Sequence, residues 1–216
     1  MKRILTSITL ADSKKDEHAA ALSGITGGCT WRITGMYDNY TLAISGNGVM
    51  EDHTHNNLAP WHEKCCRGLK TLVIHNGVTA IGNYAFYGCE KLTGLLKIPN
   101  SVTVIGYWAF AICHGLIAVN IPNSTTVIGS WAFYGCTELA GIMIPASVIS
   151  IGDLSFAYCR SLTAVTNFNP KPQSINSSVF EYVDTGNIVL SVPAGSHEAY
   201  RNANVWKDFG SIRAIS

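Results

Sequence analysis

A nine-residue phrase recurs four times in the middle of this chain, and it limits what the chain can fold into more than any other feature. Each copy has isoleucine first, glycine second, phenylalanine sixth and cysteine ninth, and the copies begin at Ile81, Ile105, Ile128 and Ile151. The closing cysteines therefore lie 24, 23 and 23 residues apart. A unit of that length cannot bury its own apolar face, so neighbouring units must stack around a shared core. The sequence predicts a solenoid.

A short apolar stretch follows each cysteine and is typical of a strand. Its best example is Val119-Asn120-Ile121-Pro122, where apolar residues alternate with a polar one before proline. Period-two alternation predicts a strand with Val119 and Ile121 inward, and proline ends it because proline has no N–H to donate. Related stretches at 72–74, 96–98 and 142–144 predict further strands. One extra residue near Gly94 accounts for the longer first period and predicts a small bulge.

The phrase itself is expected to form a short helix after its glycine. In the first copy Ala85, Phe86 and Cys89 fall broadly on one helical face. Phenylalanine at one register in every unit predicts a stacked aromatic column. A second column is expected at Tyr84, Trp108, Trp131 and Leu154. The fold class is therefore an α/β repeat solenoid, a leucine-rich-repeat stack of about five rungs with parallel strands on one side and short helices on the other.

Seven cysteines are present, and four of them occupy one position of the repeat. Stacked rungs place those four side chains at the strand spacing of ~4.8 Å, pointing the same way. Disulfide pairing along this ladder is conceivable, but buried free thiols are the expected state.

Composition excludes several classes of protein. The chain has 216 residues, of which 47% are hydrophobic and only 13% charged, which excludes a disordered protein. Its formal net charge of +1 favours neither nucleic acid nor an anionic membrane as a partner. No apolar run approaches the ~18 residues of a membrane-spanning helix.

The flanks of the repeats predict two caps, because an open solenoid end would expose core and an unpaired strand edge. Residues 1–24 are expected to be a leader or disordered tail, with a signal-peptide remnant as one interpretation of Met1 to Ala11. Residues 25–68 are expected to form an N-terminal β cap around a hairpin at 30–45. Repeats occupy 69–167. The C-terminal cap, 168–216, is expected to hold a strand at 188–192, a helix at 198–206 with Ser196 as N-cap, and a closing segment at 212–215.

The phrase from Ile98 to Cys113 reads Ile-Pro-Asn-Ser-Val-Thr-x-Ile-Gly-x-x-Ala-Phe-x-x-Cys. It resembles the BspA-type leucine-rich repeat, and both flanks are similar to the ends of proteins in that family. The resemblance implies a surface or secreted protein with a role in adhesion to extracellular-matrix proteins and host cells. It also implies that function resides in the repeat surface, although a fold alone does not determine function.

One cluster of metal-ligand residue types lies before the first repeat. His53, His55, His62 and Cys65, with Cys66 beside it, are suitable zinc ligands. Their spacing matches no standard zinc finger, and the other interpretation is a polar loop with a buried cysteine. No phosphate-binding loop, nucleophile elbow or dinucleotide fingerprint is present. The sequence therefore predicts no enzyme activity and no cofactor.

The candidate binding surface is the outward side of the predicted strands. Its residues are small and nearly uncharged, which suits a peptide or another protein. The candidates are Val73, His75, Lys97, Ala118, Asn120, Gly141, Met143, Ala164 and Thr166, with Leu95 as a further possible member. Tyr87, Tyr107 and Tyr134 on the opposite side form a rival patch. A strip without dedicated ligand contacts is the remaining interpretation.

These observations predict a non-enzymatic protein-binding or adhesion module, located outside the cell or on its surface. The expected partner is a host or extracellular-matrix protein, with no role for nucleic acid and no transmembrane segment. A structural spacer of a larger surface protein is the first alternative, and an enzyme with a metal site in a cap is the second.

Overall fold

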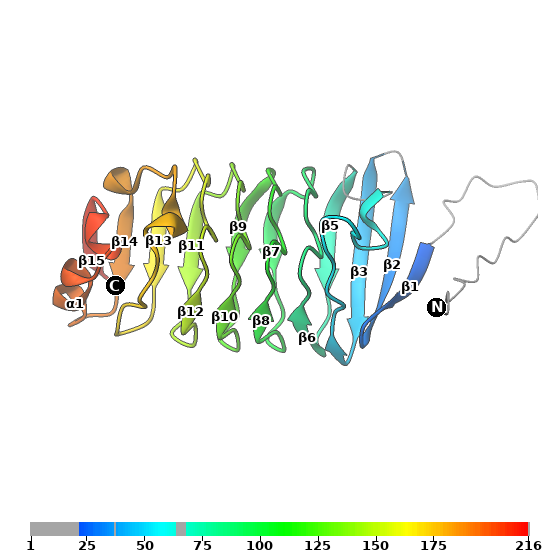
Figure 1. Ribbon diagram of the computed structural model, residues 1–216, viewed down its shortest axis with the longest axis horizontal. Coiled ribbons are helices and arrows are strands. Elements are labelled where there is room, and N and C mark those ends of the chain that lie inside the picture. Colours follow the sequence, from blue (N-terminus) through cyan, green and yellow to red (C-terminus); the bar gives the residue numbers. More distant parts are fainter. Residues whose placement is uncertain (1–21, 37, 64–67, 216) are drawn as a thin grey trace, which may run out of the picture.

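The computed structural model describes residues 22–36, 38–63 and 68–215. These residues form an elongated stack in which β1 (Leu22–Thr26) and β15 (Ser211–Ala214) lie at opposite ends (Figure 1). Chain positions 23 or 24 residues apart lie side by side along the stack, as the period predicts.

Four strands at the N-terminal end form one sheet in the order β1-β2-β3-β5. The added strands are β2 (Cys29–Met36), β3 (Asn39–Gly46) and β5 (Leu69–Ile74). β2 is antiparallel to both β1 and β3, whereas β3 and β5 are parallel. Because β1 begins at Leu22, the expected boundary of the leader at residue 24 falls inside a strand. The rest of the predicted leader, up to residue 21, lies outside the described residues.

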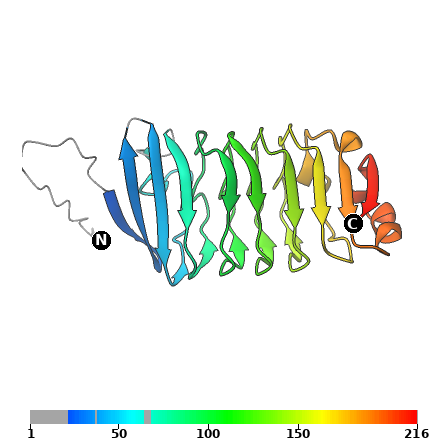
Figure 2. The ribbon, with the colours of Figure 1, turned by 180° about the vertical axis from the view of Figure 1, so that it is seen from behind.

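A parallel sheet of six strands continues along the stack. Its members are β7 (Gly94–Lys97), β9 (Leu116–Asn120), β11 (Gly141–Ile144), β13 (Ala164–Asn167), β14 (Val189–Val192) and β15. β7 lies beside β5, so the two sheets form one row of strands when the molecule is seen from behind (Figure 2). Val119 and Ile142 are buried while Asn120 and Met143 are exposed, as the alternation predicts. The pairing register shifts between Gly94 and Leu95, where a bulge was expected.

A second parallel sheet is formed by short strands, each of which comes a few residues after a strand of the first row. It contains β4 (Gly48–Val49), β6 (Val78–Ile81), β8 (Val104–Ile105), β10 (Val127–Ile128) and β12 (Ser150–Ile151). In β6, β8, β10 and β12 the last residue is the isoleucine of the repeat phrase, and its glycine follows directly.

The helices expected within the repeats are absent from residues 69–167, where consecutive turns stand in their place. Alternate N–H groups point to the next rung: Phe86 donates to the Ala109 carbonyl at 2.8 Å and Phe110 to the Ala132 carbonyl at 2.8 Å. An α-helix needs each N–H for its own carbonyl four residues back. Left-handed backbone at Trp108 (φ 57°) and Trp131 (φ 62°) also breaks any helix. The prediction of short helices is therefore wrong, although the faces it assigned to the side chains are correct.

The predicted phenylalanine column runs through the core. Phe86, Phe110, Phe133, Phe156 and Phe180 are buried, and successive ring centroids lie 5.1–5.8 Å apart in stacked geometry. A tryptophan meets the column at each end, Trp61 stacked on Phe86 and Trp206 edge-on to Phe180. Both indoles are fully buried, so large aromatic rings close the two ends of the column.

The repeat cysteines follow the column. Cys113, Cys136 and Cys159 are free and buried, and each thiol donates to a phenylalanine carbonyl one rung back at 3.2–3.3 Å. Burial raises the pKa of Cys136 to about 12, which keeps the thiol protonated and unreactive. Cys89 is disulfide-bonded, so the expectation of a free thiol at that position is wrong.

Among the described residues, His62 and Glu63 belong to a short π-helical turn, and the other helices lie at the C-terminal end. The latter are the 3₁₀ turns η2 (Ser177–Phe180), η3 (Thr185–Asn187) and η4 (Trp206–Asp208), and the α-helix α1 (His197–Asn202). The helix expected at 198–206 is thus broken into α1 and η4. Ser196 occupies the N-cap position of α1, but its side chain makes no capping hydrogen bond.

Candidate protein-binding face

Figure 2 shows the row of strands from β2 to β15 from behind. We call the outward side chains of these strands the strand face. Within β7, β9, β11 and β13 the register places these side chains in two parallel rows. One row contains Leu95, Ala118, Gly141 and Ala164. The other contains Lys97, Asn120, Met143 and Thr166. The structure therefore brings seven of the nine predicted residues together on these four strands, and it adds Leu95.

The two remaining candidates belong to β5. Val73 is exposed at the repeat position of Lys97 and continues the second row. His75 is also exposed, but it follows the last residue of β5 and takes the repeat position of Pro99. It therefore lies at the margin of the strand face.

The strand face extends beyond the predicted residues at both ends. At the C-terminal end Thr166 is followed in register by Ser191 and then Arg213. At the other end Val73 is preceded by Ala43 and then Arg32. Neither end contains the repeat phrase, so its period gave no reason to include them. Arg32 alternates with the buried Trp31 and Ile33, which is the signal that points to it. Arg213 has no such signal, since Ala214 beside it is exposed.

Exposed apolar side chains occupy the middle of the strand face. Val73, Leu95 and Met143 are 37%, 53% and 49% exposed on β5, β7 and β11. Most residues around them are small, which leaves the surface flat. Apolar side chains in the middle of a flat surface, surrounded by small residues with little charge, are typical of the core of a protein interface.

Charge on the strand face has one sign. Arg32, Lys97 and Arg213 are exposed, and no aspartate or glutamate lies among the outward residues of the described strands in this row. Arg213 Nε donates to Ser211 Oγ at 3.1 Å, which holds its guanidinium along β15.

The rival tyrosines lie on the turn segments opposite and pack against neighbouring rings. Tyr87 and Tyr134 each have their ring centroid 5.6 Å from that of Trp108. Trp108 in turn stacks on Trp131 with centroids 4.5 Å apart and planes 9° from parallel. Burial raises the pKa of Tyr84 in the same group, and Tyr107 and Tyr87 raise it further. The stacked faces of Trp108 and Trp131 stabilise the molecule. Tyr107 packs edge-on against Trp108 and remains 40% exposed, so it is the rival candidate that a ligand can reach.

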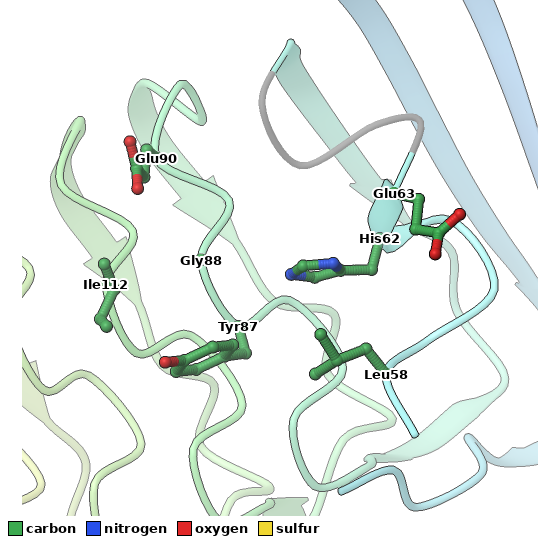
Figure 3. Close-up of a pocket in the computed structure, with 7 residues that line it drawn as sticks. All are labelled: Leu58, His62, Glu63, Tyr87, Gly88, Glu90 and Ile112. Carbon is green, nitrogen blue, oxygen red and sulfur yellow. The ribbon is translucent and has the colours of Figure 1, made fainter. Parts of the chain in front are cut away.

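An open cavity of about 490 Å³ lies between the segment before the repeats and the first two rungs. Its lining residues are Leu58, His62, Glu63, Tyr87, Gly88, Glu90 and Ile112 (Figure 3). The His62 imidazole stacks over the Tyr87 ring at 6.5 Å, and the two carboxylates lie on opposite sides of the cavity (Figure 3).

The predicted metal ligands do not converge in the part of the chain that the structure describes. His53 is buried edge-on against Trp61, whereas His55 and His62 contact the ring of Tyr87. Burial lowers the pKa of His53, with the charges of Glu51 and Asp52 opposing that effect. Residues 22–36, 38–63 and 68–215 contain no group of three metal-ligand side chains, and Cys65 lies outside these ranges.

Two further observations bear on function. The thiol of Cys113 is buried and its pKa is raised well above the usual value, so the Cys113-His114 pair offers no nucleophile. Among the described residues no helix combines the length and apolar character needed to cross a bilayer.

Residues 63–187 match the family described as the BspA type leucine rich repeat region, in six copies. A solved leucine-rich repeat protein from Eubacterium ventriosum is 19% identical, with a TM-score of 0.52, and the match covers 90% of this chain and 62% of that one. A leucine-rich repeat protein from T. pallidum is 21% identical, with a TM-score of 0.49 and coverage of 88% and 81%. The likeness to the E. ventriosum protein shows a shared fold. No curated protein matches the chain significantly.

Proposed function

Since this chain belongs to the family of BspA-type leucine-rich repeat proteins, we propose that it is a non-enzymatic protein-binding module that binds its partner with the strand face. The observation that carries the proposal is the exposed apolar group Val73, Leu95 and Met143 in the middle of a flat surface of otherwise small residues with little charge. Stable protein contacts are built on such a desolvated centre.

The partner class we propose is a host or extracellular-matrix protein, met outside the cell or on its surface as an adhesion contact. The family resemblance of the repeat phrase supports this location and partner. The unreactive repeat thiols and the dispersed histidines support a role in binding rather than catalysis.

The working unit we propose is about five rungs over residues 69–167, held between an N-terminal β cap at 25–68 and a C-terminal α/β cap at 168–216. The antiparallel strands β1 to β3 and the buried Trp61 support the first cap. α1, η4 and the buried Trp206 support the second.

A structural spacer in a larger surface protein is the second candidate. The elongated stack, with β1 and β15 at opposite ends, favours it (Figure 1). A spacer needs no ligand on its strand face, and this difference separates the two proposals.

The test measures binding of the purified protein to a panel of extracellular-matrix proteins by surface plasmon resonance. We expect at least one member to bind the wild type, and the double variant Leu95→Asp/Met143→Asp to weaken that binding at least tenfold, about 1.4 kcal/mol. The control is Ile149→Asp, which alters an exposed isoleucine outside the strand face and leaves affinity unchanged. Equal binding by all three proteins would remove the strand face from consideration, and a panel without any binder would favour the spacer.

A further inference from the structure

Resting on the proposed function, we propose that the partner of the strand face is a distinct protein with an acidic contact surface, in which apolar side chains are flanked by aspartate or glutamate. The inference concerns the partner's chemistry. It follows from how charge is distributed over this molecule.

Three cations of the strand face, Arg32, Lys97 and Arg213, lie in one row, and a further exposed cation, Lys70, lies on β5. The paired residues lead from Arg32 through Ala43 to Val73, and from Lys97 through Asn120, Met143, Thr166 and Ser191 to Arg213. At a strand spacing of ~4.8 Å, Lys97 lies roughly 14 Å from the strand of Arg32 and roughly 24 Å from that of Arg213. Cations therefore stand at both ends of the row and beside the apolar centre.

These cations are free to meet a partner. All three are exposed, and none forms an ion pair with another described residue. Arg213 uses only its Nε in an internal hydrogen bond, which leaves the terminal guanidinium nitrogens for bidentate contact with a carboxylate.

Acidic residues gather on the other side of the molecule. The turn segments 82–93, 106–115, 129–140, 152–163 and 176–188 carry five acidic residues against two basic ones. These are Glu90, Glu138, Asp153, Glu181 and Asp184 against Lys91 and Arg160. The formal net charge of +1 is thus the sum of a positive strand face, the negative turn segments and the rest of the chain.

This separation excludes other occupants of the strand face. Two copies packed strand face to strand face would bring cations together around their apolar centres, and like charges oppose such a contact. A nucleic acid carries a charge every ~1.7 Å, which three cations spread over the length of the row cannot match. A protein surface with an apolar centre and widely spaced carboxylates satisfies both features of the strand face.

Panning a phage-displayed library of random 12-residue peptides against the immobilised protein tests the proposal. The panning uses no competitor, and the recovered peptides are then compared on the charge-reversed variant Arg32→Glu/Lys97→Glu/Arg213→Glu. The matched control is Lys91→Glu/Lys171→Glu/Lys207→Glu, which changes net charge equally at exposed lysines outside the strand face. Circular dichroism verifies that both variants fold.

We expect the recovered peptides to be net negative with at least one large apolar residue. They should bind the wild type and the matched control at least tenfold more tightly than the charge-reversed variant at 0.05 M salt. The difference should shrink at 0.5 M salt, because screening weakens exposed charge pairs.

The outcomes separate the two proposals. Neutral or basic peptides whose binding is lost in Leu95→Asp/Met143→Asp would leave the strand face as the site and overturn the acidic partner. Peptides indifferent to all strand-face variants, or no enrichment at all, would count against both. Salt-sensitive self-association in sedimentation velocity, abolished by the charge-reversed variant, would assign the strand face to the turn side of a second copy instead.

Discussion

Two glycines of the repeat phrase serve different purposes. The first, represented by Gly129, lets adjacent rungs approach: a Cβ on it would lie 2.7 Å from the carbonyl carbon of Gly106. The other, represented by Gly135, has a left-handed backbone (φ 69°) but open space around it. Ile112 and Tyr158 adopt the same left-handed conformation at the equivalent position of other units. Only the first glycine is therefore required by packing.

Alanine at these positions should have unequal effects. Gly129→Ala forces backbone against backbone, and we expect it to lower the free energy of unfolding by about 3 kcal/mol, the upper end of the usual cost of overpacking. Gly135→Ala meets no atom closer than 3.9 Å, so it should cost only the left-handed conformation, roughly 1–2 kcal/mol. Urea denaturation of both variants measures the difference. Equal losses would show that rung spacing adjusts to a methyl group.

We expect His53 to make the N-terminal end sensitive to acid. The residue is 6% exposed, and its Nε2 has no hydrogen-bond partner among the described residues. Burial lowers its pKa below the ordinary value of 6.5, although Glu51 and Asp52 work in the opposite direction. The unfolded chain therefore binds this proton more readily than the folded chain, so the contribution of neutral His53 to stability is lost as pH falls below about 6.5.

We predict that His53→Leu reduces the loss of stability between pH 7.5 and pH 5.0. The measurement is the urea midpoint of the wild type and the variant at both pH values. His75→Gln is the control, because His75 is exposed and its removal should leave the pH dependence as it was. An unchanged pH dependence in His53→Leu would place the acid sensitivity elsewhere.

At the level of elements, strands were predictable and turns were not. Apolar and polar residues alternate in Val119-Asn120-Ile121 because one side of the strand faces the core. This pattern is visible within a single repeat unit, so the strand could be predicted. Whether residues after Gly106 form a helix or turns depends on where their N–H groups bond. The Phe110 N–H bonds to a carbonyl of the next rung, a partner that the local pattern does not reveal. Helical spacing and stacked turns both place Ala109, Phe110 and Cys113 inward, which explains why a wrong element gave a correct core.

The residues of the candidate site likewise fall into those that the sequence predicted and those that it did not. Residues such as Asn120 and Met143 were predictable because they occupy one position of a repeat. Arg32 and Arg213 were missed because they belong to strands outside the repeats, and only strand pairing places them in the same row. The charge pattern of the strand face is thus a property of the assembled sheets.

At the scale of the whole molecule, each unit contacts its neighbours in the same way, so a unit should be removable. Deleting residues 114–136 joins Cys113 to Thr137 and keeps every column in register. We expect a folded protein whose free energy of unfolding is lower by about 1–3 kcal/mol, the share of 23 residues in a typical protein.

Deletion of residues 114–125 is the matched control. It removes half a unit, misaligns the phenylalanine column and should leave the chain unfolded. Circular dichroism and urea denaturation compare the two proteins. Failure of the whole-unit deletion to fold would mean that this unit is not interchangeable with its neighbours.

The hydrogen bonds between rungs run along the long axis of the stack, and β1 and β15 lie at its two ends (Figure 1). Tension applied between those ends would peel one rung at a time instead of shearing a whole sheet. Each released unit would lengthen from ~4.8 Å to roughly 75 Å. Optical tweezers should record a series of low-force steps, whereas a single high-force rupture would contradict this geometry. A molecule that unfolds in this manner lengthens stepwise under load, so the force on whatever is attached to its ends rises gradually.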